Sequence, residues 1–215
     1  MANQYGNLGN LYGTRGNLAS AEKAYLKSLA IEKELGRKEG MASDYGNLGI
    51  LYKTRGDLAA AEEAYLKGLA LNKELGRKEG MANQYGNLGN LYKTRGDLDA
   101  AEEAYLKSVA LNEELERKEG MANQYGNLGN LYRTRGDFCA AEEAYLEGLG
   151  IDEELGRKEG MASKYGNLGA LFEERGQIAE ARVAWNKSLT LYHQIGIAHM
   201  VELIESWLAD LPKDD

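Results

Sequence analysis

Amide and cationic side chains that recur at a fixed interval are the chemistry-bearing groups of this chain. The first asparagine row is Asn7, Asn47, Asn87, Asn127 and Asn167, and the second is Asn10, Asn90 and Asn130. An asparagine amide offers both a donor and an acceptor, so a row of amides can bind a peptide backbone without reading its side chains closely. The cations that lie three residues beyond the second row are Lys53, Lys93 and Arg133. These cations can pair with acidic groups of a partner.

Groups suited to catalysis or to metal binding are scarce. The two histidines, His193 and His199, lie near the C-terminal end, and the single cysteine, Cys139, has no histidine near it in the sequence. The adjacent acids Glu62 and Glu63 recur in later repeats, but neighbouring helix residues do not face each other, so a solvated face is expected. A catalytic or metal site requires convergent unlike groups. We therefore predict that the chain is not an enzyme and binds no metal or cofactor.

The elements that position these groups repeat every 40 residues. The segment MANQYGNLGN at residue 1 returns as MASDYGNLGI at 41, as MANQYGNLGN at 81 and 121, and as MASKYGNLGA at 161. Each unit holds two apolar patterns of helical period, separated by TRGD or a close variant. In the first repeat Gly16 is suited to a left-handed helix end, and Asn17 is suited to capping the next helix. Each repeat is predicted to be a helix, a tight turn and a helix.

One face of the first helix in each repeat is predicted to be buried. The residues at i, i+3, i+4 and i+7 of this face are Tyr5, Leu8, Gly9 and Tyr12. A glycine inside a helix costs about 1 kcal/mol relative to alanine, so Gly9 and its equivalents need a packing reason. Close approach of a neighbouring helix, with an aromatic residue such as Tyr25 beside the glycine, supplies that reason.

The order of aromatic and small residues resembles the tetratricopeptide repeat pattern. In the second repeat the pattern residues are Tyr45, Leu48, Gly49, Tyr52, Gly56, Ala61, Tyr65 and Gly68. Corresponding residues recur in all five repeats, so the resemblance covers about 200 residues. It implies an all-α fold, a right-handed α-solenoid of helix-turn-helix repeats.

The repeat is longer than the common 34-residue form of that family. Lys33 and its equivalents stand where the family usually places a helix-ending proline, so the second helix is predicted to continue to Leu35 and to stop at Gly36. Glu116 replaces this glycine in the third repeat and is expected to be strained. A 40-residue unit with an NLGN core resembles the Leu-Gly-Asn repeat proteins of spindle orientation and bacterial regulatory repeat proteins.

We predict a single domain over residues 1–215. Its repeats are 1–40, 41–80, 81–120, 121–160 and 161–196. Residues 197–211 have an amphipathic pattern that predicts a capping helix, because a terminal repeat would otherwise expose its apolar side. Met1 is preceded by no equivalent of the RKEG turn, so the first repeat is expected to have an exposed edge.

In tetratricopeptide proteins the first helices line a concave groove, and the resemblance places the asparagine rows and the cations there. The residues that break the repetition and would set the register of a bound peptide are Ile50, Ala170, Glu173 and Lys164. The asparagines could equally bond each other or helix ends, or face water, although Ile50 and Ala170 indicate that the fold does not require asparagine in the second row. The cations could be ordinary solvated charges near a helix C-terminus.

Composition restricts the class of partner. The net charge of -8 and the pI near 5.0 argue against nucleic acid, which requires clustered Lys and Arg. With no membrane-spanning apolar run and no signal peptide, the chain is predicted to be cytoplasmic. We predict a protein-interaction scaffold that binds a peptide, acidic peptides included, as a monomer or as a weak homo-oligomer through its first repeat. The alternatives are a self-associating structural module and a sensor segment of a larger regulatory protein.

Overall fold

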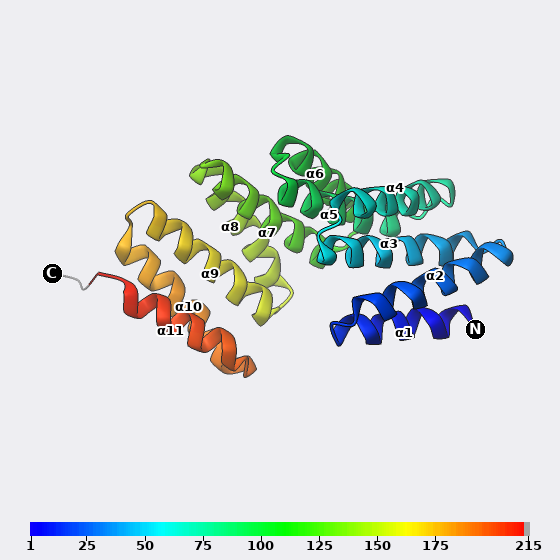
Figure 1. Ribbon diagram of the computed structural model, residues 1–215. Helices are drawn as coiled ribbons and strands as arrows, with labels where there is room; N and C mark the ends of the chain where they lie inside the picture. Colours follow the sequence, from blue (N-terminus) through cyan, green and yellow to red (C-terminus); the bar gives the residue numbers. More distant parts are fainter. Residues whose placement is uncertain (213–215) are drawn as a thin grey trace. The chain divides into compact units, whose positions relative to one another are not determined.

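A computed structural model describes residues 1–212, and every regular element within them is an α-helix. The eleven helices of this described part follow one another along the chain (Figure 1). Their bounds are α1 (Ala2–Thr14), α2 (Leu18–Glu34), α3 (Lys38–Arg55), α4 (Leu58–Glu74), α5 (Lys78–Arg95), α6 (Leu98–Glu114), α7 (Lys118–Arg135), α8 (Phe138–Glu154), α9 (Lys158–Glu174), α10 (Ile178–Ile195) and α11 (Ala198–Asp210). The predicted all-helical fold is confirmed.

The helices fall into two compact units, one from Met1 to Leu111 and one that begins at Asn112, so the division lies within α6. In the first unit α1 packs on α2, α2 on α3, α3 on α4, and α4 on α5. In the second unit α7 packs on α8, α8 on α9, α9 on α10, and α10 on α11. Within each unit these pairs join helices that are adjacent in the sequence, which is the packing of an α-solenoid built from helical repeats.

Glycine and a capping side chain form the turn inside each of the first four repeats, whereas Gln177 of the fifth makes no side-chain cap. Gly56 follows α3 with a φ of 85°, in the left-handed region. Asp57 then caps α4, because its Oδ1 accepts a hydrogen bond from the Ala60 backbone N–H at 3.2 Å. Asn17, Asp97 and Asp137 make the equivalent bond. The predicted turn and these four N-caps are confirmed.

The second helix of each repeat ends as predicted, but the first helix begins earlier. α2 ends at Glu34 and is followed by left-handed Gly36, with a φ of 65°. Glu116 adopts the same conformation with a φ of 53°, and within residues 1–212 it is the one residue other than glycine to do so. The prediction that RKEG is a turn is wrong in part. α3 begins at Lys38, so Gly40 lies inside the helix.

The core of each repeat forms where an aromatic ring lies on a bare stretch of helix backbone. A Cβ atom at Gly49 would stand 2.4 Å from the Tyr65 ring, so a larger residue would displace the ring. The equivalent glycines of the other four repeats have the same relation to Tyr25, Tyr105, Tyr145 and Trp185. The predicted reason for these helical glycines is confirmed.

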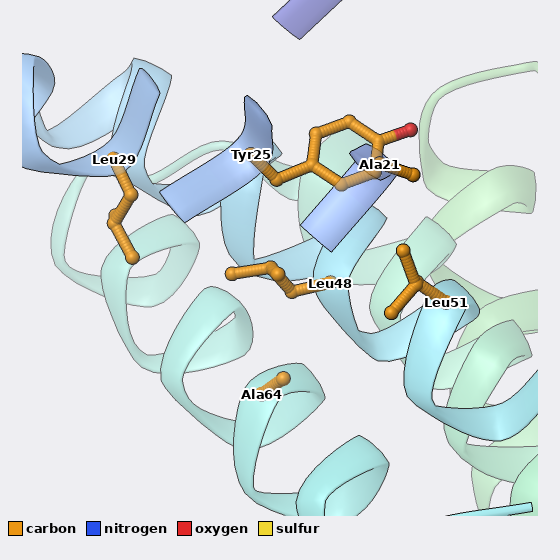
Figure 2. Close-up of a cluster of buried hydrophobic side chains, with 6 residues drawn as sticks. All are labelled: Ala21, Tyr25, Leu29, Leu48, Leu51 and Ala64. Atoms are coloured by element: carbon orange, nitrogen blue, oxygen red, sulfur yellow. The ribbon is translucent and has the colours of Figure 1, made fainter. Parts of the chain in front are cut away.

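The core continues from one repeat into the next. Figure 2 shows Tyr25 of α2 in one buried cluster with Leu48 of α3 and Ala64 of α4. Met41 packs against this cluster from the start of α3.

The predicted capping helix is confirmed as α11. Ile204 is fully buried, and Leu211, just beyond the helix, is buried as well. The ring centroids of Trp207 and Trp185 of α10 lie 5.5 Å apart. The apolar side of the fifth repeat is therefore covered.

The first repeat has the exposed edge that was predicted for it. Leu8 and Leu11 of α1 are 39% and 43% exposed. The equivalent residues of α3, Leu48 and Leu51, are buried. Among the described helices α1 packs on α2, whereas α3 packs on both α2 and α4, which accounts for the difference in exposure.

Candidate peptide-binding site

The first asparagine row lies on the side of the first helices that we call the helix-A face. Asn7 is exposed, and the half-buried members of the row are Asn47, Asn87, Asn127 and Asn167. Asn127 Nδ2 donates to Gln124 Oε1 at 3.1 Å. Within residues 1–212, no hydrogen bond engages the side chains of Asn47 and Asn87. These two amides of the first unit can therefore offer both a donor and an acceptor to a ligand.

The second asparagine row is engaged by the fold. The Tyr25 hydroxyl donates to Asn10 Oδ1 at 2.7 Å. Tyr105 donates to Asn90 and Tyr145 to Asn130, each at 2.8 Å. Burial raises the pKa of Tyr145 to about 12, so this phenol stays protonated and remains a donor. Each bond occupies the amide oxygen and leaves the amide Nδ2, a donor, for a ligand.

The interruptions of the second row have a structural reason in the fifth repeat. Trp185 stands there in place of tyrosine, and its indole Nε1 donates to the Gly166 carbonyl at 3.0 Å. An asparagine in place of Ala170 would therefore have no phenol to accept from. In the second repeat Ile50 is exposed, and the buried Tyr65 has a pKa raised well above its usual range by burial. The fold therefore uses asparagine at this position in three repeats, where it accepts from a tyrosine, but Ile50 beside Tyr65 agrees with the prediction that the fold does not require it.

The three cations of the helix-A face are half-buried. Lys53 and Lys93 belong to the first unit, and Arg133 belongs to the second. Arg133 Nε lies 3.7 Å from Glu174 Oε1, so its charge is partly balanced by its own fold. Glu173 is exposed in the equivalent place of the fifth repeat.

Arginines beside the turns connect successive repeats. Arg95 Nη1 lies 2.7 Å from Glu62 Oε2 of the preceding repeat, and its guanidinium carbon lies 5.0 Å from the centre of the Tyr92 ring. Arg55 repeats this contact with Glu22. The expectation of a purely solvated face is therefore wrong for Glu62, whose carboxylate joins two repeats.

Lys164 is not a groove residue, which corrects the prediction that it helps to set the register of a peptide. It is 4% exposed, and its Nζ lies 2.8 Å from Oδ2 of the fully buried Asp152. Arg157 Nη1 lies 2.9 Å from the other carboxylate oxygen. Lys164 is drawn inward because Asp152 would otherwise be a buried charge with a single, half-exposed partner.

Buried polar residues between successive repeats are the feature that sequence reasoning missed. One comes from the end of a second helix and one from the first helix that follows. The buried polar residues at these two positions are Glu32 and Asp44, Asn72 and Gln84, Asn112 alone, and Asp152 and Lys164, whereas Tyr192 and the apolar Ile204 occupy them at the last junction. We call these positions the junction pair.

Glycines make room for the junction pairs. A Cβ atom at Gly40 would stand 2.4 Å from the Glu32 side chain, and one at Gly160 would stand 2.3 Å from Asp152. The signal in the sequence was the change from Asp44 to Gln84 to Lys164 within otherwise near-identical segments. A helical period alone assigns these polar residues to solvent.

The sequence profile of the tetratricopeptide repeat family matches residues 1–74 and 80–154. These segments make up more than half of the chain, and the chain therefore belongs to the tetratricopeptide repeat family. Members of this family are generally protein-interaction scaffolds without enzymatic activity. A search of curated protein sequences gives no match. No helix within residues 1–212 has the length and the apolar run needed to cross a membrane.

Solved structures share the fold at low sequence identity. BtubC (BKLC) from P. vanneervenii is similar with a TM-score of 0.78 and 22% identity, over 99% of this chain and 83% of that one. The apo form of RapI gives 0.87 and 14%, over 99% and 78%. A STAND signal-transduction ATPase from Pyrococcus horikoshii, which has a tetratricopeptide repeat sensor, gives 0.84 and 14%, over 95% of this chain and 31% of that one. The predicted α-solenoid is confirmed.

Proposed function

We propose that the helix-A faces bind a peptide segment of a partner protein, as the concave groove of the solenoid. The observation that carries the proposal is the orientation of the second asparagine row. Because tyrosine hydroxyls occupy the Oδ1 atoms of Asn10, Asn90 and Asn130, these residues present their Nδ2 donors to a ligand. A surface of donors favours a partner rich in acceptors.

The neighbouring cations favour the same chemistry. Lys53 and Lys93 lie one turn beyond the second row and carry donors that hold a full positive charge. Hydrogen bonds from charged donors to carboxylates are stronger than those between neutral groups. The proposed partner is therefore an extended or helical peptide with Asp or Glu side chains, bound through its carboxylates and its backbone carbonyl groups.

The setting proposed for this binding is the cytoplasm. Cys139 is a free and exposed thiol, which fits a reducing compartment. The 40-residue unit and its NLGN core further favour a relation to the Leu-Gly-Asn repeat proteins.

Calorimetry with a peptide selected from a random library on the intact chain tests the proposal. Asn47→Ala with Asn87→Ala removes two amides that the fold does not use, and each lost hydrogen bond should cost about 0.5 to 1.5 kcal/mol of binding free energy. Asn186→Ala on α10 is the matched control and should leave the affinity unchanged.

The cations are tested with the same peptide. Lys53→Glu with Lys93→Glu should weaken an acidic peptide, and the loss should shrink at high salt because ions screen exposed charges. Circular dichroism must show an intact fold in each variant. Unchanged affinity in both double variants would remove the binding site from the helix-A face.

A second candidate function is a sensor segment within a larger regulatory protein. The likeness to the STAND protein favours it, because that protein carries a tetratricopeptide repeat sensor and the part of it matched here is 31% of its chain. A third candidate is self-assembly through the first repeat, favoured by the exposed Leu8 and Leu11. In that case Leu11→Asp would abolish self-association, measured as a rise of molecular mass with concentration, and would leave peptide binding intact.

A further inference from the structure

Two tyrosines of the first helices, Tyr45 of α3 and Tyr85 of α5, each lie between two lysines from the second helices on either side. In the first unit Tyr45 lies between Lys33 of α2 and Lys67 of α4, and each Nζ is 5.7 Å from the ring centre. Tyr85 has the same relation to Lys73 at 5.7 Å and to Lys107 at 5.6 Å. These distances are within the range of a cation–π contact, so the rings help to hold the ammonium groups in place.

The space beside Tyr85 is a shallow groove of about 300 Å³. Leu66 of α4 and Ala104 of α6 line it together with Lys73 and Lys107. The groove therefore combines apolar walls with positive charge. Lys67 and Lys107 each also pair with a glutamate one turn earlier in the same helix, so Lys33 and Lys73 supply the excess positive charge of this side.

The positions beside Tyr125 are acidic in the second unit, whereas Tyr165 has one acid, Glu153, and one cation, Lys187, whose Nζ is 4.9 Å from the ring centre. At Tyr125 the residues equivalent to Lys73 and Lys107 are Glu113 and Glu147, and burial, followed by these negative charges, raises the pKa of this tyrosine. Tyr165 donates from its hydroxyl to Glu153 Oε1 at 3.3 Å. The residues equivalent to Lys33 and Lys73 are thus Glu113 and Glu153.

The net charges of the two parts of the chain follow the same division. Residues 1–111 contain 15 Lys and Arg against 14 Asp and Glu, whereas residues 112–215 contain 11 against 20. The second helices also share an apolar feature in both units. The exposed leucines, 45 to 49% accessible, are Leu26, Leu66, Leu106 and Leu146.

We propose that the chain self-associates through its second helices, with the Tyr45 and Tyr85 side of one molecule docking on the Tyr125 side of a second copy. The two surfaces are built on equivalent positions, so Lys73 and Lys107 beside Tyr85 match Glu113 and Glu147 beside Tyr125 in spacing and are opposite in sign. Complementary charge steers the encounter and excludes like-charged pairings. The leucines supply apolar area to either side of the contact. This surface is made of second-helix side chains and of the first-helix tyrosines between them, and it uses none of the asparagines or cations of the helix-A face.

Sedimentation equilibrium of the intact chain, from micromolar to millimolar concentration, tests the proposal. At low ionic strength the mass should rise with concentration towards a multiple of the chain mass. At high ionic strength the dissociation constant should rise by about tenfold or more, because the contact depends on charge.

Charge reversal at one position per repeat gives the sharpest version of this test. Lys33→Glu with Lys73→Glu makes both surfaces acidic, and Glu113→Lys with Glu153→Lys makes both basic. Each double variant alone should remain monomeric at concentrations where the wild-type chain associates. An equimolar mixture of the two double variants should associate again, and so should a chain that carries all four changes.

Lys53→Glu with Lys93→Glu changes the net charge of the chain by the same amount as the first double variant, but on the helix-A face. It should keep the wild-type self-association. Circular dichroism must show that every variant is folded, since glutamate in the last turn of α2 and α4 is unfavourable to the helix dipole.

Two outcomes would overturn the proposal. A chain that stays monomeric at every concentration and ionic strength has no self-association surface; if it then binds poly-glutamate through Lys33 and Lys73, this side takes an acidic segment of another protein. Self-association that persists in both double variants would lie on another surface, such as the exposed edge of the first repeat.

Discussion

The junction between the first and second repeats and the junction between the fourth and fifth occupy equivalent positions, yet their electrostatics are opposed. At the first junction two acids, Glu32 and Asp44, are 3% and 5% exposed. At the other junction Asp152 and Lys164 form a buried ion pair. Two like charges are thus buried where two opposite charges are buried elsewhere in the same chain.

The acid pair is accompanied by a raised pKa at Asp44 and by one cation at its edge. Burial raises the pKa of Asp44 to about 6, a hydrogen bond with Ser28 lowers it, and the charge of Glu32 raises it. Arg37 Nε lies 3.1 Å from Glu32 Oε2. In a linear array each repeat contacts its neighbours, so the stability of one junction can depend on pH while the next does not. Each of these two junctions therefore has its own buried polar pair and its own dependence of stability on pH.

The largest effect is expected from breaking the ion pair. Lys164→Met leaves Asp152 buried with Arg157 as its remaining partner, and we expect a loss of about 3 kcal/mol in the free energy of unfolding. Urea unfolding followed by circular dichroism measures this loss, and hydrogen exchange locates it in α8 and α9.

The second and third repeats provide the matched control for this variant. Asp152→Asn with Lys164→Gln reproduces the amide pair Asn72 and Gln84, and Gly148 already matches Gly68. This control should lose about 1 kcal/mol or less, because no charge remains buried without a partner. An equal loss in Lys164→Met and in the control would show that the ion pair does not matter to the junction.

The acid junction should respond to pH in the opposite sense from a typical salt-bridged carboxylate. The pKa of Asp44 is about 6 in the folded chain and lies near 3.8 when unfolded, so the folded state holds the proton more tightly. The ionisation of Asp44 therefore lowers the free energy of unfolding progressively as the pH rises from about 4 to about 6. Asp44→Asn removes this penalty and should stabilise the chain by up to about 3 kcal/mol at pH 7.

The difference between Asp44→Asn and the wild-type chain isolates this group from the other carboxylates. Urea unfolding of both proteins across the acidic range should show the difference shrink towards zero near pH 4. A difference that does not vary with pH would mean that Asp44 titrates normally in the folded state.

The smallest effect concerns the turn that leads into each junction. Gly36 and Gly156 are left-handed at the two junctions compared here, whereas Glu116 holds this conformation in the third repeat. A side chain in that region costs about 1 to 2 kcal/mol, partly offset by the greater entropy of glycine in the unfolded chain. Glu116→Gly should therefore raise the melting temperature modestly, and Gly156→Glu should lower it by a similar amount.

The helices, turns and caps could be predicted because each depends on neighbours in the sequence. Gly16 and Asn17 act within a few residues, and the helical period identifies Gly49 as a position of close approach. The junction pairs could not be predicted, because Asp44 and Lys164 are polar residues whose burial depends on a different helix and on the space beside Gly40 and Gly160. The second asparagine row was placed correctly on the first helices, but its bonds to tyrosine depend on packing within the repeat.

The contact between Trp185 and Trp207 gives the chain a spectroscopic reporter at one end. The chain has two tryptophans, and these rings lie 5.5 Å apart, tilted by 36°, in α10 and α11. Tryptophan emission therefore reports the separation of the last helix from the fifth repeat, whereas tyrosine absorbance is spread over all five repeats. Emission excited at the red edge, where tyrosine does not absorb, will reveal fraying at the C-terminal end before the bulk of the helices is lost.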